Sequence, residues 1–343
     1  MISESRTMSN HKRWKSTANL LLKILVTSAL LYWVLRGVDL KEAIVQVKQV
    51  KGEYLLLTLI LTWFGHFLCV IRWRLFLELL HIPLRTGRLI LIYFIGMFSN
   101  LILPGLVGGD LVKIVLTGRS TDRHYSKALT SVYLDRAMGF LALLLIALFS
   151  SLAFPLVVQG FNLFWGFLIV TICFLAVNII LFHPQAHQWV LRLSQKTGHQ
   201  GISVKTQKLV AAFSGLQKDY LRLGFTFLLS LVNQLLGLFY SFLISLALGI
   251  DAPFFYFAVF IPAITLITMI PVSINGMGLR EMATALFFQT IGVSKHQGVL
   301  LGFLFSLLII VSSLPGAIAY ILHKNEVSSE ELAAVEKELS AGE

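Results

Sequence analysis

Apolar stretches of roughly membrane-spanning length alternate with short polar segments along most of this chain. A helix that crosses a bilayer needs about 20 apolar residues, and six stretches come close to that length. They cover residues 19–35, 54–71, 128–153, 163–182, 223–249 and 298–322. The pattern predicts an all-α polytopic membrane protein with about six full spans, and the segments between them are too short for a sizeable soluble domain.

The composition agrees with this pattern. Of the 343 residues, 57% are hydrophobic and 13% are charged, whereas soluble domains have about 25% charged residues. The first apolar stretch has no small-x-small cleavage site, so we expect it to stay in the mature chain. We therefore expect a cytoplasmic N-terminal segment (1–18), a transmembrane domain (19–324) and an acidic cytoplasmic tail (325–343).

Basic residues gather in the loops beside the spans, and the formal net charge is +11. Lys and Arg in such loops set the orientation of a membrane protein and attract anionic headgroups, so we assign no nucleic-acid partner. The basic N-terminal segment and the His323-Lys324 end of the last span predict that both termini are cytoplasmic. We expect a multi-pass protein of a bacterial-type cytoplasmic (inner) membrane.

Two segments combine apolar runs with helix-breaking residues. Residues 89–118 contain Pro104 and have basic clusters on both flanks. A single crossing would place one cluster outside, so we predict a re-entrant hairpin that enters from the cytoplasm. Residues 252–297, which are broken at Pro271, begin and end outside in the same topology and predict a second hairpin that enters from the opposite face.

Both hairpins consist of an apolar half-helix, a proline, a pair of glycines and a second half-helix with charge in its first turn. This plan is typical of an inverted repeat, in which secondary transporters build a site from discontinuous helices near the membrane midplane. The alternative is that Pro and Gly only kink ordinary spans, because both are common in membrane helices. Broken backbone inside a bilayer has to lie in protein or beside water, so the breaks are the first candidates for a functional site.

Polar, charged and glycine residues gather at the two breaks and early in the third span. We predict a substrate-binding set made of Asn100, Gly108, Gly109, Asp110, Lys113, Asp135, Arg136, Asn275, Gly276, Gly278, Arg280 and Glu281. The helix after each break would point backbone N–H groups and the positive end of its dipole into the interior, which suits a phosphate or another anion. Lys113 and Arg280 would add positive charge, while Asp110 and Glu281 would neutralise them or receive a cationic headgroup. The alternative is a set of purely structural ion pairs.

Asp135 and Arg136 lie about two turns into the third span. Adjacent helical residues point about 100° apart and do not face each other, so each needs a partner elsewhere. Lys113 and Asp110 are the nearest candidates by depth. An alternative is that Arg136 extends toward the headgroups at the interface.

The sequence lacks the motifs of common cofactor and metal sites. It has no G-x-x-x-x-G-K-[ST] phosphate loop. Pro184 lies between His183 and His187, and no third metal ligand is nearby. The outer loops offer no paired carboxylates for acid–base chemistry. We therefore expect no cofactor, no metal and no enzymatic activity.

Several motifs, in order along the chain, resemble those of a known family. They are Arg72-Trp73 at the end of the second span, the Asn100 to Lys113 segment, Asp135-Arg136 with Gly139, and the Pro271 to Glu281 segment. Over about residues 18–324 the chain resembles the lysylphosphatidylglycerol synthase transmembrane family, also described as flippase-like or UPF0104-type membrane proteins. The resemblance implies a multi-span domain that carries lipids between leaflets. It does not imply synthase activity, because the chain has no room for the soluble aminoacyl-transferase domain.

Together these features predict a lipid translocase, a flippase or scramblase, that passes a polar or anionic headgroup through a hydrated groove formed by the two hairpins. Its partners would be membrane lipids, either an anionic phospholipid or a polyprenyl-phosphate-linked lipid. A second copy of the chain and enzymes of envelope biogenesis are further candidate partners. Without a phosphate loop, exchange would be passive or coupled to an ion gradient or the membrane potential. The alternative functions are a membrane-embedded transferase acting on lipid-linked substrates and a non-catalytic scaffold.

Overall fold

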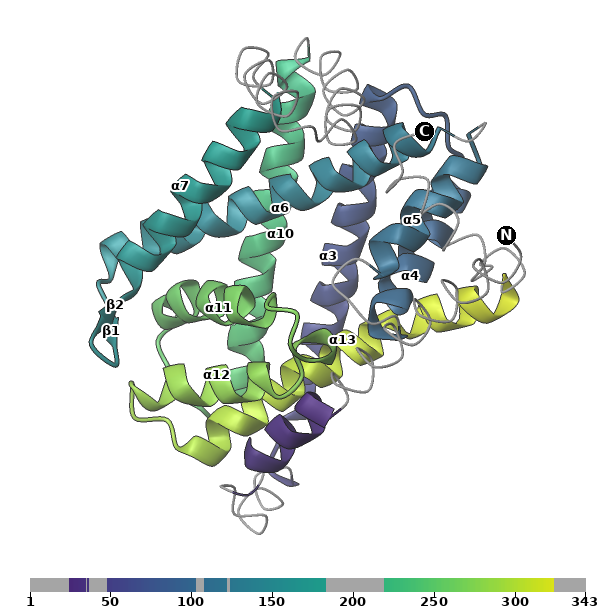
Figure 1. Ribbon diagram of the computed structural model, residues 1–343. Coiled ribbons are helices and arrows are strands. Elements are labelled where there is room, and N and C mark those ends of the chain that lie inside the picture. The colour runs from purple at the N-terminus through teal and green to yellow at the C-terminus, as the bar shows by residue number, and fades with distance from the viewer. Residues whose placement is uncertain are drawn as a thin grey trace, which may run out of the picture.

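The computed structural model of the chain describes residues 25–34, 36, 48–102, 108–121, 124–182 and 219–323. Helices make up nearly all of this part, as Figure 1 shows. The expected N-terminal segment (1–18), the expected acidic tail (325–343) and Pro104 lie outside the described residues. His183 and His187 lie outside them as well.

A helix over Leu25–Val34 comes first in the described chain. The elements that follow are α3 (Gly52–Leu79), α4 (Thr86–Ile102), α5 (Gly108–Arg119), α6 (Tyr125–Ala153), β1 (Val157–Val158), β2 (Phe161–Asn162), α7 (Leu163–Phe182), α10 (Tyr220–Ala247), α11 (Phe254–Thr268), the short 3₁₀ helix η2 (Ile274–Gly276), α12 (Leu279–Gln289) and α13 (Lys295–Leu322). β1 and β2 form a small antiparallel hairpin between α6 and α7.

Five helices are long and apolar enough to cross a membrane: α3, α6, α7, α10 and α13. They coincide with five of the six predicted spans. The remaining predicted span, 19–35, is described from residue 25 onward as the Leu25–Val34 helix. The prediction of an all-helical, multi-pass membrane protein is confirmed, while the total of six spans stays a prediction.

The side chains of α7 illustrate why these helices need a lipid environment. This helix has no charged residue and leaves Trp165, Ile169 and Ile172 more than half exposed. A helix that is apolar on every side is typical of a membrane span, because only hydrocarbon can cover all of its faces. Lipid therefore takes the place of a protein partner along much of α7.

The helices form two halves with the same packing plan. α3 to α6 make one half and α10 to α13 the other. In the first half α4 packs against α5 and α5 against α6, and in the second half α11 packs against α12 and α12 against α13. Between the halves α3 packs against α10, α4 against α13 and α11 against α6. Figure 1 shows α3 and α10 in the middle of the molecule, with α4 and α5 on one side and α11 and α12 on the other.

Close backbone packing and a side-chain cap hold the first break together. α4 and α5 come so close that a Cβ atom on Gly109 would overlap the carbonyl oxygen of Gly96. Asn100, near the end of α4, accepts a hydrogen bond from the backbone N–H of Gly109 at 2.9 Å. The first four N–H groups of a helix have no partner within the helix. The Asn100 side chain therefore satisfies one of these groups at the start of α5.

Left-handed backbone conformations produce the second break. Asn275, Gly276 and Gly278 have φ angles of 50°, 73° and 83°, which a right-handed helix cannot accommodate. The Leu25–Val34 helix packs against this break, since Thr27 accepts a hydrogen bond from the Ile274 N–H at 2.9 Å. The chain between α11 and α12 is thus held by a helix from the other end of the sequence.

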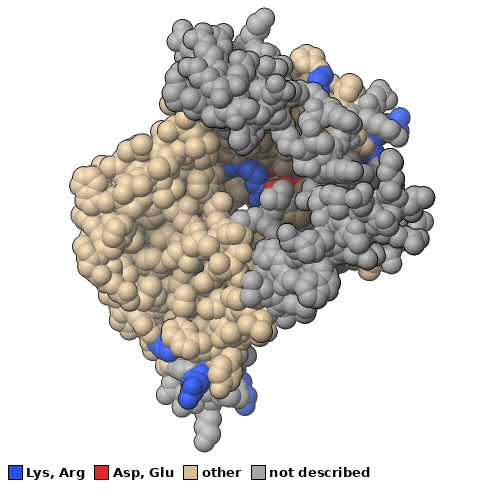
Figure 2. All heavy atoms as spheres, viewed as in Figure 1, with Lys and Arg blue, Asp and Glu red and all other residues tan. Residues whose placement is uncertain are grey.

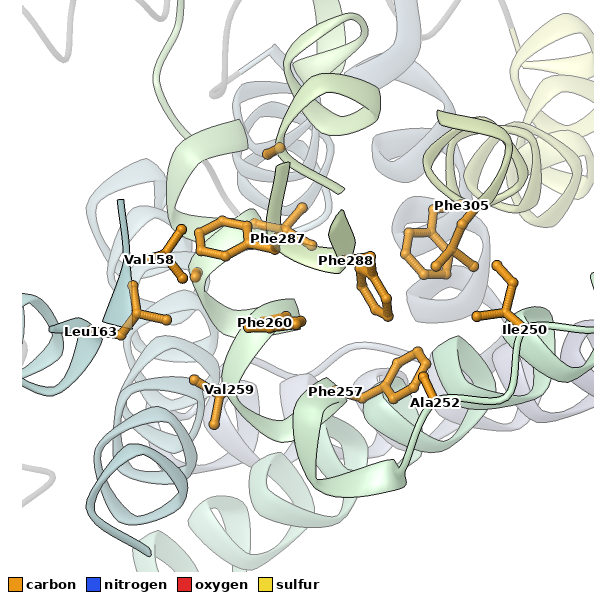
Figure 3. Close-up of a cluster of buried hydrophobic side chains, with 14 of the residues drawn as sticks. Val158, Leu163, Ile250, Ala252, Phe257, Val259, Phe260, Phe287, Phe288 and Phe305 are labelled. Atoms are coloured by element: carbon orange, nitrogen blue, oxygen red, sulfur yellow. The ribbon is translucent and has the colours of Figure 1, made fainter. Parts of the chain in front are cut away.

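Aromatic side chains fill the interior between α11 and α12. Phe257 and Phe260 of α11 lie against Phe288 of α12, with ring centroids 5.1 and 5.4 Å apart. Figure 3 shows these rings together with Phe287 and Phe305. All five side chains are buried, and an aromatic pair in such geometry contributes about 0.5–1.5 kcal/mol beyond its burial. Apolar contacts therefore stabilise the second hairpin.

Gly109→Ala should destabilise the protein, because the added methyl group would overlap the Gly96 carbonyl oxygen between α4 and α5. Overpacking of this kind typically costs about 1–3 kcal/mol, which a lower thermal unfolding temperature in detergent would report. The matched control is Gly87→Ala, in the first turn of α4, where an added Cβ atom has no neighbour within 4 Å. Equal unfolding temperatures for the two variants would contradict the close packing of α4 on α5.

Candidate functional site

A cavity of about 720 Å³ lies among α3, α4, α5, α6, α7, α10 and α11. Its lining combines charged side chains from α3, α5 and α6 with apolar side chains from α6 and α7. Figure 2 shows a hollow on this side of the molecule, with basic and acidic atoms at its floor, next to a broad described surface that carries no charge. This cavity is the candidate functional site.

An ion pair at the cavity wall joins α3 to α6. Arg72 Nε donates to Asp135 Oδ1 at 2.7 Å, and less than a tenth of each side chain is exposed. Arg72 Nη1 also donates to the Ser230 hydroxyl of α10 at 3.0 Å. A buried ion pair without further hydrogen bonds barely repays its desolvation, so this additional bond matters. One arginine thus connects three membrane-spanning helices.

A second ion pair joins α6 to the first turn of α5. Arg136 Nε and Nη2 each donate to one carboxylate oxygen of Asp110, both at 2.9 Å. The Asp110 carboxylate is buried and also lies near the positive end of the α5 dipole, which favours its charge. By contrast, 56% of the Arg136 side chain is exposed, and it lines the cavity.

These contacts test the expected partners of Asp135 and Arg136. The expected pairing of Arg136 with Asp110 is present. The partner of Asp135 is Arg72 rather than Lys113. The reason is that α3 packs against α6 and places the Arg72 guanidinium group beside Asp135. Sequence order alone could not place α3 beside α6.

Lys113 is the third cation of the cavity, and its contacts differ from those of the two arginines. Within the described chain it makes no ion pair and no hydrogen bond, although only 6% of the residue is exposed. Its Nζ atom lies 4.4 Å from the ring centroid of Tyr93 and 5.3 Å from that of Trp73. Cation–π contacts with two rings are favourable, but they do not neutralise the charge. Around the described cavity, three cations therefore face two carboxylates.

Further polar groups at the cavity were not among the predicted site residues. They are His66, Tyr93, Tyr133, Asn178, Asn233 and Gln234. The His66 Nδ1 atom lies 3.3 Å from the Tyr93 hydroxyl. Its Nε2 atom is buried and has no hydrogen-bond partner among the residues that the structure describes. His66, Cys69 and Arg72 recur every three residues, so helical spacing along the second span could have revealed this face.

The residues of the second break form a separate cluster away from the cavity lining. Arg280 donates to the Ser306 hydroxyl of α13 at 2.9 Å and to the backbone carbonyl of Asn275 at 3.0 Å. Ser306 in turn donates to Glu281 at 2.6 Å. The other oxygen of Glu281 accepts a hydrogen bond from the Gly278 N–H at 2.6 Å. The described structure contains no direct Arg280–Glu281 ion pair, and Ser306, which the sequence did not single out, bridges the two charges.

The twelve predicted site residues therefore fall into two groups. Asn100, Lys113, Asp135 and Arg136 line the cavity, and Gly108, Gly109 and Asp110 form the start of α5 behind them. The remaining five belong to the second break, where Arg280 and Glu281 are buried. Within the described residues, only Thr265 of α11 and Met269, directly after α11, extend the cavity lining to the α11–α12 pair.

The chain is similar to a known family of membrane proteins. Residues 20–316 match the family described as the lysylphosphatidylglycerol synthase TM region. The chain is also similar to the UPF0104 membrane protein PH1989 of Pyrococcus horikoshii, with 22% identity over 307 residues that cover 82% of this chain and 88% of that relative. No solved structure matches the chain. The matched residues include both charged clusters.

Asp135→Asn should destabilise the protein strongly, because it leaves the buried Arg72 charge without its carboxylate. Removing one partner of a buried ion pair costs about 3–5 kcal/mol, which thermal unfolding in detergent would detect. Adding Arg72→Gln to this variant should recover part of the loss, because no uncompensated charge then remains.

The matched control for this prediction is Glu78→Gln. It breaks an exposed ion pair with Arg74 on the same helix, and exposed pairs contribute about 0–1 kcal/mol. A loss for Asp135→Asn no greater than the loss for Glu78→Gln would show that the Arg72–Asp135 pair does not hold α3 against α6.

Proposed function

The chain belongs to the lysylphosphatidylglycerol synthase transmembrane family, and from this premise we propose that it moves a polar or anionic lipid headgroup between the two leaflets of the membrane. The headgroup occupies the charged part of the cavity while the acyl chains stay in hydrocarbon. Translocation is passive or driven by an ion gradient or the membrane potential. The protein acts in the cytoplasmic membrane of a cell, with both termini on the cytoplasmic side.

The observation that carries this proposal is the mixed lining of the cavity. The cations Arg72, Lys113 and Arg136 and the apolar side chains of Phe140 and Phe174 line the same cavity. Charges at membrane depth cost several kcal/mol unless they are paired or hydrated. A cavity that holds polar groups beside apolar walls offers a lipid headgroup an environment that the hydrocarbon core does not.

The matched packing of the two halves supports an inverted repeat with two re-entrant hairpins. α4 with α5, and α11 with α12, are pairs of short helices joined at a break, and each pair packs on the long helix that follows it. Each pair also contacts the long helix of the other half. Secondary transporters use such repeats to open a central site alternately to either side. We assign the α4–α5 hairpin to the cytoplasmic face and the α11–α12 hairpin to the outer face.

Cysteine accessibility tests the first hairpin. In a background without Cys69 and Cys173, single cysteines replace Gly87 and Ser120, two exposed positions at the two ends of the α4–α5 pair. Both should resist a membrane-impermeant thiol reagent in intact cells and react after permeabilisation. If only one of the two cysteines reacted in intact cells, the α4–α5 segment would cross the membrane completely and the hairpin assignment would be wrong. Asp251→Cys, before α11, is the outside control and should react in intact cells.

Lipid exchange in reconstituted vesicles tests the function directly. Purified protein should speed the exchange of headgroup-labelled phosphatidylglycerol, cardiolipin or a polyprenyl-phosphate lipid, measured by the accessibility of the label to a membrane-impermeant quencher. Arg136→Gln should slow exchange, because it removes a cation exposed to the cavity, while Arg74→Gln, on an exposed surface of α3, should not. Exchange no faster than in empty vesicles for all three lipids would reject the translocase. Turnover of a lipid-linked donor by the same preparation would favour a transferase instead.

A further inference from the structure

Among the described residues that line the cavity, Lys113 is the cation without a direct ion pair, and this indicates what the cavity binds. We propose that Lys113 binds the phosphodiester group of a lipid whose headgroup carries no amine, such as a glycerol headgroup. This inference rests on the proposed function and narrows it to a substrate class.

Lys113 is buried, and the part of the chain that the structure describes gives it no anionic partner. Its ammonium group can donate three hydrogen bonds, and none is made to any residue that the structure describes. A charge in a low-dielectric setting is retained where a counter-ion compensates it. The aromatic rings of Tyr93 and Trp73 hold the ammonium group in place but supply no negative charge. Among the described residues, the cavity therefore has one carboxylate fewer than it has cations.

Other unused donors border the same cavity. Arg136 uses Nε and Nη2 for Asp110, which leaves its Nη1 group available on a side chain exposed to the cavity. His66 Nε2, on the α3 wall, has no hydrogen-bond partner among the described residues, and it is a donor in the tautomer whose Nδ1 accepts from the Tyr93 hydroxyl. Lys113 itself lies in the second turn of α5, close to the helix end whose dipole favours an anion. The two non-bridging oxygens of a phosphodiester share one negative charge and accept several hydrogen bonds at once, so these donors match it.

The carboxylates of the site argue against an amine in the headgroup. Asp110 accepts two hydrogen bonds from Arg136, and Asp135 is paired with Arg72. An ammonium group in the cavity would have to displace one of these arginines, because the described lining offers no other acidic side chain. The remaining polar groups include Asn233 and Gln234, which are uncharged and suit hydroxyl groups. The preferred headgroup is thus a phosphodiester with an uncharged polyol.

The apolar part of the lining favours a lipid over a free anion. Phe140, Leu143, Phe174 and Val177 continue the cavity toward α7, a helix whose exposed face is apolar. A free phosphate would gain nothing from these side chains, whereas an acyl chain or a glycerol backbone would be covered by them. A free phosphate and a lipid phosphodiester would accept hydrogen bonds from the same donors, so the experiment has to distinguish these two ligands.

The test compares the leaflet exchange of two labelled lipids in vesicles containing wild-type protein, Lys113→Met, Lys113→Arg or Lys295→Met. One lipid is phosphatidylglycerol and the other is a neutral diacylglycerol glycolipid without phosphate. Lys295 is the matched control, because it also lies over an aromatic ring, Trp33, at 5.8 Å, but is exposed and outside the cavity lining. The ratio of the two rates in one sample does not depend on the fraction of folded protein.

Lys113→Met should lower the rate for phosphatidylglycerol relative to the neutral lipid about tenfold or more, the size expected for a lost hydrogen bond to a charged group. Lys113→Arg should keep most of the rate, and Lys295→Met should behave as wild type. An unchanged ratio in Lys113→Met would overturn the assignment. Labelled phosphatidylethanolamine, measured as a third lipid with the wild type, would also overturn it if it exchanged faster than phosphatidylglycerol.

A binding measurement separates this inference from the translocase proposal. Short-chain phosphatidylglycerol should raise the thermal unfolding temperature of wild-type protein in detergent but not that of Lys113→Met, even if no lipid is exchanged and the proposed function fails. Inorganic phosphate should have little effect at the same concentration. If phosphate alone stabilises the wild type through Lys113, the site binds a free anion and the lipid assignment is wrong. If neither compound does so, the anion site itself is rejected.

Discussion

Charge pairing inside the membrane domain is the constraint on which the rest of this structure depends. A carboxylate or guanidinium group at this depth is stable only with a partner or with water. The two arginine–aspartate pairs meet this requirement and connect three helices. Arg72–Asp135 holds α3 to α6, and Arg136–Asp110 holds α6 to the start of α5. Arg72, Asp135 and Arg136 of these pairs also line the cavity. Residues that stabilise the first half therefore form part of the polar lining of the cavity.

The second half applies the same plan with different chemistry. Arg136 and Ser306 each lie eleven residues after the first residue of their helix, α6 or α13, and each contacts the carboxylate in the first turn of the preceding short helix. In the second half the short hydroxyl of Ser306 takes the place of the long arginine. Phenylalanine side chains pack between α11 and α12, whereas the described cavity is lined mostly by helices of the first half.

The sequence predicted the parts of this fold that depend on local pattern. Five apolar stretches are helices where expected, and both breaks occur at their Gly-containing segments. Pairing across the molecule was harder to foresee. That Arg72 meets Asp135, or that Ser306 lies between Arg280 and Glu281, depends on which helices become neighbours, and the local residue pattern does not show this. The polar face of α3 was missed for another reason: His66 resembles an ordinary packed histidine until its unpartnered Nε2 atom is seen in the cavity.

The most direct test of the central claim is to locate the bound headgroup. Phosphatidylglycerol with a photoreactive group in the headgroup is crosslinked to the protein in vesicles, and the modified residues are identified by mass spectrometry. The account predicts adducts on residues of α3, α5 and α6 that line the cavity, such as His66, Tyr133 and Lys113. Adducts confined to the exposed outer face of α7, with none in the cavity, would contradict it.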